Sequence, residues 1–83
     1  LAPDLAEAQY WRGRCEAERQ QFAAAQPALQ RAVRSAEPDA AWLADAYLWL
    51  GRAAEAVRDP AAARAAYESY LRLAPAKGPG RTE

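Results

Sequence analysis

Residues 47–63 read YLWLGRAAEAVRDPAAA, and this stretch decides the fold. Its first half mixes alanine and leucine with aromatic side chains around one glycine, and alanine has the highest intrinsic helix propensity. Asp59-Pro60 then interrupts the pattern. Aspartate is a favoured N-cap, and proline at the first helical position sacrifices no hydrogen bond. The stretch therefore predicts a helix that ends near Val57, a short corner, and a helix that begins at Pro60.

The rest of the chain has a similar helical composition. Val33, Val57 and Thr82 are the only β-branched residues, and strands favour β-branched side chains. We therefore predict an all-α fold with helices over about residues 5–18, 22–36, 40–57 and 60–73, followed by a flexible tail. Pro27 lies within the second predicted helix, so that helix either kinks or begins nearer Ala24.

Helical spacing of apolar residues predicts which faces point inward. The third helix has the clearest stripe, with apolar residues at 43, 46, 47, 50, 54 and 57. For the first helix we expect an inward face of Leu5, Ala8, the Arg12 stem, Cys15 and the Trp11 ring. For the fourth we expect Ala63, Ala66, Tyr67, Tyr70 and Leu71.

The chain repeats itself at an offset of 38 residues. This offset places Gly13 on Gly51, and it aligns helix with helix and corner with corner. The other matched pairs are Ala25 with Ala63, Leu29 with Tyr67, and Ala32 with Tyr70. Such periodic self-similarity is typical of helical-repeat proteins. We therefore divide the chain into a first unit, 4–37, and a second unit, 38–76, with 1–3 closing an earlier copy and 77–83 as the tail.

This pattern resembles the tetratricopeptide repeat. The second unit carries the family's sparse signature at Tyr47, Leu50-Gly51, Ala63, Tyr67 and Pro75; the first keeps Gly13, Phe22, Ala25, Leu29 and Ala32. The first unit departs from it with Gln9 at the aromatic place, Arg12 for leucine, and Pro38 one residue late. The resemblance implies two antiparallel helix pairs stacked as a short right-handed α-solenoid, from the end of a longer array. The high alanine and arginine content favours a bacterial origin. A generic four-helix bundle is the alternative.

The offset of 38 exceeds the family's 34 residues by four, which is close to one helical turn. The additional residues lie around Asp39 to Leu43. We expect them to lengthen the third helix by about one turn at its N-terminal end and to project Trp42 past its neighbours. A looser corner is the alternative.

The composition argues against catalysis and against several kinds of ligand. Eleven basic and eleven acidic residues cancel, so no strong field attracts nucleic acid. The chain contains no histidine, the commonest general base, and a single cysteine, Cys15. Glu16, Glu18 and Asp45 are better explained as a solvated helix face than as a metal site. We expect no enzyme activity, no cofactor, no metal and no membrane insertion by this segment.

The resemblance instead implies a protein-interaction module, an adaptor or scaffold segment of a larger protein. Its groove would be formed by the first helix of each pair, and a partner would present an acidic and apolar segment to it. The groove residues expected from this resemblance are Tyr10, Trp11, Arg14, Leu48, Trp49 and Arg52. Trp11 and Trp49 could alternatively pack in the core.

Two other functions compete with this one. The fourth helix could mediate self-association through Tyr67, Tyr70 and Leu71, giving a homo-oligomer, or the segment could be a regulatory sensor fused to an upstream domain. The sequence favours a cytoplasmic location and leaves a periplasmic or membrane-anchored parent protein open.

Overall fold

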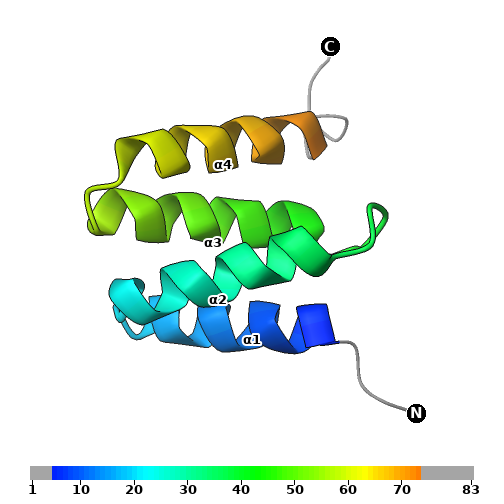
Figure 1. The fold of residues 1–83 in the computed structure, drawn as a ribbon, viewed down its shortest axis with the longest axis horizontal. Coiled ribbons are helices and arrows are strands. Elements are labelled where there is room, and N and C mark those ends of the chain that lie inside the picture. Colours follow the sequence, from blue (N-terminus) through cyan, green and yellow to red (C-terminus); the bar gives the residue numbers. More distant parts are fainter. Residues whose placement is uncertain (1–4, 74–83) are drawn as a thin grey trace.

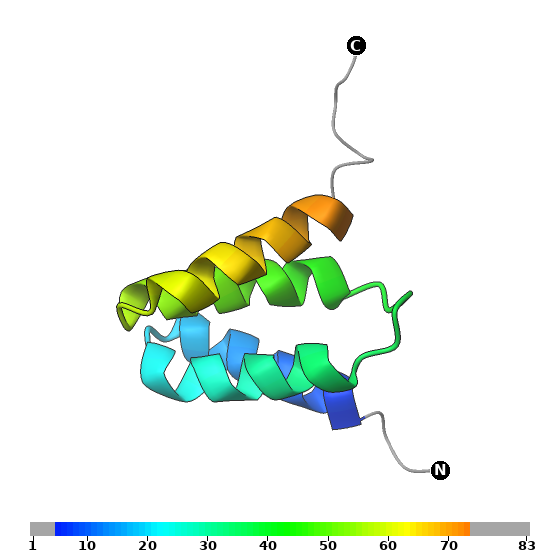
Figure 2. The ribbon, with the colours of Figure 1, turned by 45° about the horizontal axis from the view of Figure 1, so that its top comes forward.

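The computed structural model describes residues 5–73, which form four α-helices of 14 residues each. α1 spans Leu5–Glu18, α2 Phe22–Ser35, α3 Leu43–Ala56 and α4 Pro60–Leu73. No strand occurs within these residues. The helices lie side by side, with the α1–α2 and α3–α4 corners at one end and the 36–42 linker at the other (Figures 1 and 2). The predicted all-α fold of two consecutive helix pairs is confirmed, whereas the expectations for 1–3 and 77–83 lie outside the described residues.

The two corners have the same backbone geometry. Gln20 and Arg58, which are 38 residues apart, both adopt a positive φ, of 64° and 65°. In each corner the next residue donates its N–H over 2.8 Å to the carbonyl five residues back, as in a Schellman motif. Asp59 then caps α4 as predicted, since its Oδ1 accepts the Ala62 N–H at 3.3 Å.

A glycine lies where the two helices of each unit cross. A Cβ atom built on Gly13 would lie 2.6 Å from Leu29 Cγ, and one built on Gly51 would lie 2.6 Å from Tyr67 Cε1. Real Cβ atoms do not approach other atoms so closely. The large residue of α2 or α4 therefore occupies the space that the glycine leaves, in both units.

Small side chains dominate the core that joins the two units. Tyr10 and Leu29 are its largest fully buried members, and alanines supply most of the rest. The buried cluster comprises Tyr10, Ala17, Ala25, Leu29, Ala32, Ala46, Leu50, Ala53 and Ala66. α2 packs between α1 and α3, and α4 contacts α3 alone among the helices. The second unit is therefore attached to the first through α3.

The predicted extension of the third helix is wrong. α3 begins at Leu43 and has the same length as the other helices, so the looser corner is what the chain adopts. Two turns fill the linker, closed by the Ala40 N–H on Glu37 O at 3.0 Å and the Leu43 N–H on Ala40 O at 3.1 Å. They allow the Trp42 ring to stack on Tyr10, with the centroids 5.1 Å apart. Trp42 therefore packs inward and does not project past its neighbours.

The predicted inward face of the first helix is also wrong. Leu5 is 73 % exposed and Trp11 52 %, and Ala8, Arg12 and Cys15 are exposed as well. The buried residues are Ala6, Tyr10, Gly13 and Ala17. Gly13 must face α2, and this requirement fixes the rotation of α1 and turns the predicted face outward.

Two smaller predictions concern the start of α2 and the inward face of α4. α2 begins at Phe22 rather than near Ala24, so Pro27 lies in its second turn with helix assigned on both sides. In α4, Ala63 and Ala66 are buried as predicted, whereas Leu71 is 60 % exposed and does not point inward.

The helix crossing at Gly51 yields a stability prediction. Gly51→Leu should lower the free energy of unfolding by about 1–3 kcal/mol, because the new side chain must displace the Tyr67 ring. Ala65→Leu, at an exposed position of α4, is the matched control and should change stability little. Thermal and urea unfolding followed by circular dichroism measure both. An unchanged or raised melting temperature for Gly51→Leu would mean that the crossing is not tight.

The positive φ of Arg58 yields a second prediction. Glycine adopts this conformation without the Cβ clash, but it also gains freedom in the unfolded chain, so Arg58→Gly should stabilise by a net of about 0.5–1 kcal/mol. Arg58→Ala keeps a Cβ and should bring no such gain. Equal urea midpoints for the two variants would contradict the corner geometry.

Candidate partner-binding face

Tryptophan and arginine side chains alternate along one side of α1 and α3. The Arg14 guanidinium carbon lies 5.5 Å from the Trp11 ring centroid and 5.6 Å from that of Trp49. The Arg52 guanidinium carbon lies 5.1 Å from Trp49. These distances fall within the range of cation–π attraction. Trp11, Arg14, Trp49 and Arg52 therefore form one row, here called the tryptophan–arginine ladder, which runs from the first unit to the second.

Tyr10 lies beneath this ladder and links the two units. Its side chain is only 2 % exposed, and its hydroxyl donates a hydrogen bond to Asp45 Oδ2 on α3. Arg14 Nη1 donates to the same hydroxyl at 2.9 Å and lies 3.3 Å from Asp45 Oδ2. One carboxylate of the second unit is therefore held by two side chains of the first.

The environment of Tyr10 raises the pKa of its hydroxyl above the usual value. Burial is the main cause, because it disfavours the phenolate, and the hydrogen bond to Asp45 acts in the same direction. Arg14 opposes these effects by favouring the phenolate. Tyr10 consequently remains a neutral hydrogen-bond donor over the physiological pH range.

The two arginines of the ladder differ in their partners. Arg14 also pairs with Glu18 at 3.3 Å, and its side chain is 33 % exposed. Arg52 is exposed, lies over the Trp49 ring, and makes no ion pair with a carboxylate of residues 5–73. Arg14 is thus engaged within the fold, whereas the guanidinium of Arg52 remains available.

The predicted groove residues do not all lie at the surface. Trp11 is largely exposed, and its Nε1 donates to Glu7 Oε2 at 3.2 Å. Trp49 and Leu48 are partly buried, and Trp49 also packs against the core. Tyr10 lies underneath. Sequence reasoning did not find the contact between Tyr10 and Trp42, although five aromatic residues within the stretches 10–11 and 42–49 were a usable signal.

The residues predicted for self-association are spread over two environments. Tyr67 is partly buried against Gly51, and its hydroxyl donates to Glu55 Oε1 at 2.9 Å. Tyr70 is partly buried and Leu71 exposed. The Tyr67 ring is therefore part of the helix crossing as well as of the outer surface of the second unit.

Family models place the chain among known proteins. Two tetratricopeptide repeat models match in tandem, one over residues 7–38 and the other over residues 44–77. The chain belongs to the tetratricopeptide repeat family. No curated protein and no solved structure matches it.

The two tetratricopeptide matches leave residues 39–43 uncovered between them. This interval covers the second half of the linker, in which Trp42 turns toward Tyr10, and the first residue of α3. The additional residues of this chain are thus placed between the repeats and leave the helices of each repeat at equal length.

No group of three or more histidine, cysteine, aspartate or glutamate side chains that could hold a metal ion gathers within residues 5–73. In the same part of the chain, no helix has the length and apolar character needed to cross a membrane.

The raised pKa of Tyr10 predicts how stability depends on pH. The unfolded hydroxyl titrates near pH 10 and the folded one higher. Its stabilising contribution is therefore complete below about pH 10 and is lost as the pH rises through the folded pKa. Urea unfolding between pH 8 and pH 11 should show a decline that is less steep in Tyr10→Phe.

Tyr67 serves as the comparison in this experiment, because burial and the Glu55 hydrogen bond also raise its pKa. Tyr67→Phe should remove a separate share of the decline. If the free energy of unfolding of Tyr10→Phe declined with pH as steeply as that of the wild-type chain, the result would contradict the burial and hydrogen bonding described for Tyr10.

Proposed function

We propose that the ladder face of α1 and α3 binds an extended or helical segment of a partner protein that carries acidic and apolar residues. Tetratricopeptide repeats indicate a protein–protein interaction module in general. In our proposal the chain serves as a non-catalytic adaptor or scaffold segment of a larger protein. The face comprises Trp11, Arg14, Leu48, Trp49 and Arg52, with the buried Tyr10 beneath it.

The observation that carries the proposal is that the guanidinium of Arg52 is exposed and unpaired within residues 5–73. The guanidinium of this exposed arginine lies over the Trp49 ring and has no carboxylate partner among the described residues. A guanidinium can bind a carboxylate through two parallel hydrogen bonds. Stacking on Trp49 orients it and reduces the conformational entropy lost when a partner binds. We therefore assign the acidic residue of the partner to Arg52.

Tryptophan side chains supply the apolar part of the face. Trp11 exposes half of its surface, and Trp49 and Leu48 are partly exposed. Tryptophan and arginine are the residue types enriched at binding hot spots. A partner segment with a leucine or aromatic residue beside its carboxylate would cover these rings while its charge reaches Arg52.

Arg14 has a different role in this proposal. Its guanidinium is already held by Tyr10, Asp45 and Glu18. It keeps α1 and α3 in register and holds the rings of Trp11 and Trp49 apart. We therefore treat Arg14 as a positioning residue, and its loss should affect the fold as well as binding.

The test uses a panel of synthetic peptides with glutamate and leucine in varied order, together with matched peptides in which lysine replaces glutamate. Acidic peptides should bind the wild-type chain more tightly than their basic counterparts. Arg52→Glu should weaken that binding by about 1–3 kcal/mol without changing the melting temperature, and Trp49→Ala should weaken it at least as much. Isothermal titration calorimetry measures the affinities.

Two variants serve as controls. Arg31→Glu makes the same charge change at an exposed position of α2 and should leave peptide binding intact. Arg14→Glu should lower both binding and stability, because Asp45 and Glu18 lose their cation. Equal affinity for acidic and basic peptides, or unchanged binding by Arg52→Glu, would refute the proposal.

A further inference from the structure

Three contacts between the first and second units involve side chains whose positions recur along the chain. Arg14 on α1 lies 3.3 Å from Asp45 and 5.6 Å from the ring centroid of Trp49, both on α3. Gln26 on α2 donates to Asp59, in the second corner, at 3.2 Å. These contacts hold one helix pair on the next.

The residues that would repeat these contacts are already present in the chain. At the 38-residue offset, Arg14 corresponds to Arg52 and Gln26 to Arg64, on the outward side of the second unit. Asp45, Trp49 and Asp59 correspond to three residues of the first unit: Glu7, Trp11 and Gln21. Each corresponding pair keeps the same kind of contact. Arg52 and Glu7 are a cation and a carboxylate, Arg52 and Trp11 a cation and an indole, and Arg64 and Gln21 a donor and an acceptor. The outer sides of the two described units are therefore complementary to one another.

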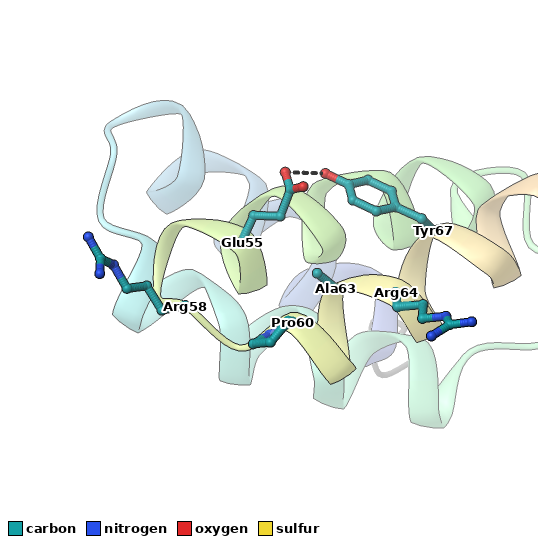
Figure 3. A pocket seen from close by; sticks show the side chains of 6 residues that line it. All are labelled: Glu55, Arg58, Pro60, Ala63, Arg64 and Tyr67. Atoms are coloured by element: carbon teal, nitrogen blue, oxygen red, sulfur yellow. Dashed lines mark hydrogen bonds between the residues drawn. The ribbon is translucent and has the colours of Figure 1, made fainter.

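The outer side of the second unit carries a hollow of about 650 Å³ between α3 and α4. In Figure 3, Pro60 and Ala63 lie below the joined Glu55–Tyr67 pair, and Arg58 and Arg64 reach outward at opposite ends. The corresponding residues of the first unit include Ala17, Ala25 and Leu29, which are buried in the cluster that α3 completes. The hollow of the second unit thus corresponds to the surface of the first unit on which α3 packs.

The outer side of α1 is the other half of this match. Leu5, Ala8, Arg12 and Cys15 are exposed. Their counterparts on α3 are Leu43, Ala46, Leu50 and Ala53, all of which are buried. α1 and α4 lie at opposite ends of the stack (Figure 1), so one chain cannot bring its own two surfaces together.

We propose that a second copy of this chain packs head to tail on the first, with α1 of one copy on the α3–α4 hollow of the other. Arg52 of one copy then meets Glu7 and Trp11 of the next, as Arg14 meets Asp45 and Trp49 within the chain. This extends the tryptophan–arginine ladder from one copy to another. Charge complementarity favours a second copy at this surface, because the positive Arg52 of one copy faces the negative Glu7 of the other.

Two features predict how strong and how large the assembly is. The Tyr10 bridge is not repeated, because Leu48 stands at the corresponding position, so association should be weaker than the contact between units. The two surfaces differ, and a contact between unlike surfaces does not close into a symmetric dimer unless the rotation returns to its start. Association should therefore be concentration-dependent and continue beyond two copies.

The test measures the mass of the chain by sedimentation velocity over a wide concentration range, with no peptide present. The wild-type chain should form dimers and larger species as its concentration rises. Arg52→Glu and Glu7→Arg should each raise the concentration at half-association by about tenfold or more. The double variant should restore association, because the opposite charges face one another again, and Arg31→Glu should behave as wild type.

Cys15 gives a second readout because it is the only cysteine of the chain and its counterpart, Ala53, is fully buried. Alkylation of Cys15 should slow as the wild-type concentration rises, and it should not slow in Arg52→Glu. Circular dichroism confirms that each variant remains helical. A monomer at every concentration, a closed dimer without larger species, or no effect of either charge reversal would each overturn the proposal.

The outcome is distinguishable from that of the proposed function. The double variant Arg52→Glu with Glu7→Arg should regain self-association but should still fail to bind acidic peptides. Peptide affinities are therefore measured at concentrations at which the wild-type chain is monomeric. If the chain binds acidic peptides but remains a monomer at every concentration, the proposed function would hold and the head-to-tail contact would be refuted.

Discussion

The close approach of two helices at a glycine is the constraint on which the rest of the structure depends. At Gly13 and Gly51 the absence of a Cβ allows Leu29 or Tyr67 to fill the crossing. Because the glycine must face the second helix of its pair, it fixes the rotation of the first helix. With α1 and α3 rotated in the same way, Trp11 and Arg14 align with Trp49 and Arg52 on one face. The alignment of the ladder residues is thus a consequence of how the glycine-bearing faces of α1 and α3 pack.

The Tyr10–Asp45–Arg14 contact then converts two helix pairs into one stack. It crosses the boundary between the units, and it engages Arg14 completely while leaving Arg52 exposed. This asymmetry arises because Leu48 and Ala56 stand in the second unit where Tyr10 and Glu18 stand in the first, and because no carboxylate of residues 5–73 pairs with Arg52 as Asp45 pairs with Arg14. The same asymmetry underlies both proposals: Arg52 can take a carboxylate from a partner segment or from Glu7 of another copy. A partner and a second copy would therefore compete for one arginine.

Local signals predicted most of the fold. Asp59-Pro60, the two glycines and the 38-residue offset depend on backbone geometry and close packing, and a sequence records these directly. The extra turn of α3 was predicted wrongly because helix propensity ignores the stacking of Trp42 on Tyr10, a contact between residues 32 positions apart. The face of α1 was predicted wrongly because its apolar pattern matches that of α3, whose equivalent face is covered by the preceding unit. Only the tertiary arrangement distinguishes the two.

The central claim is that the ladder face, and not the outer surface of α4, recognises the partner segment. Indole N–H signals in a ¹H–¹⁵N NMR titration with the tightest acidic–apolar peptide test it most directly, because the chain has three tryptophans. The account predicts that the signals of Trp11 and Trp49 and the Arg52 Nε–H shift early. Trp42, stacked on Tyr10, should move little, as should the amides of Tyr67, Tyr70 and Leu71. Shifts confined to Tyr70 and Leu71, with Trp49 and Arg52 unchanged, would contradict it.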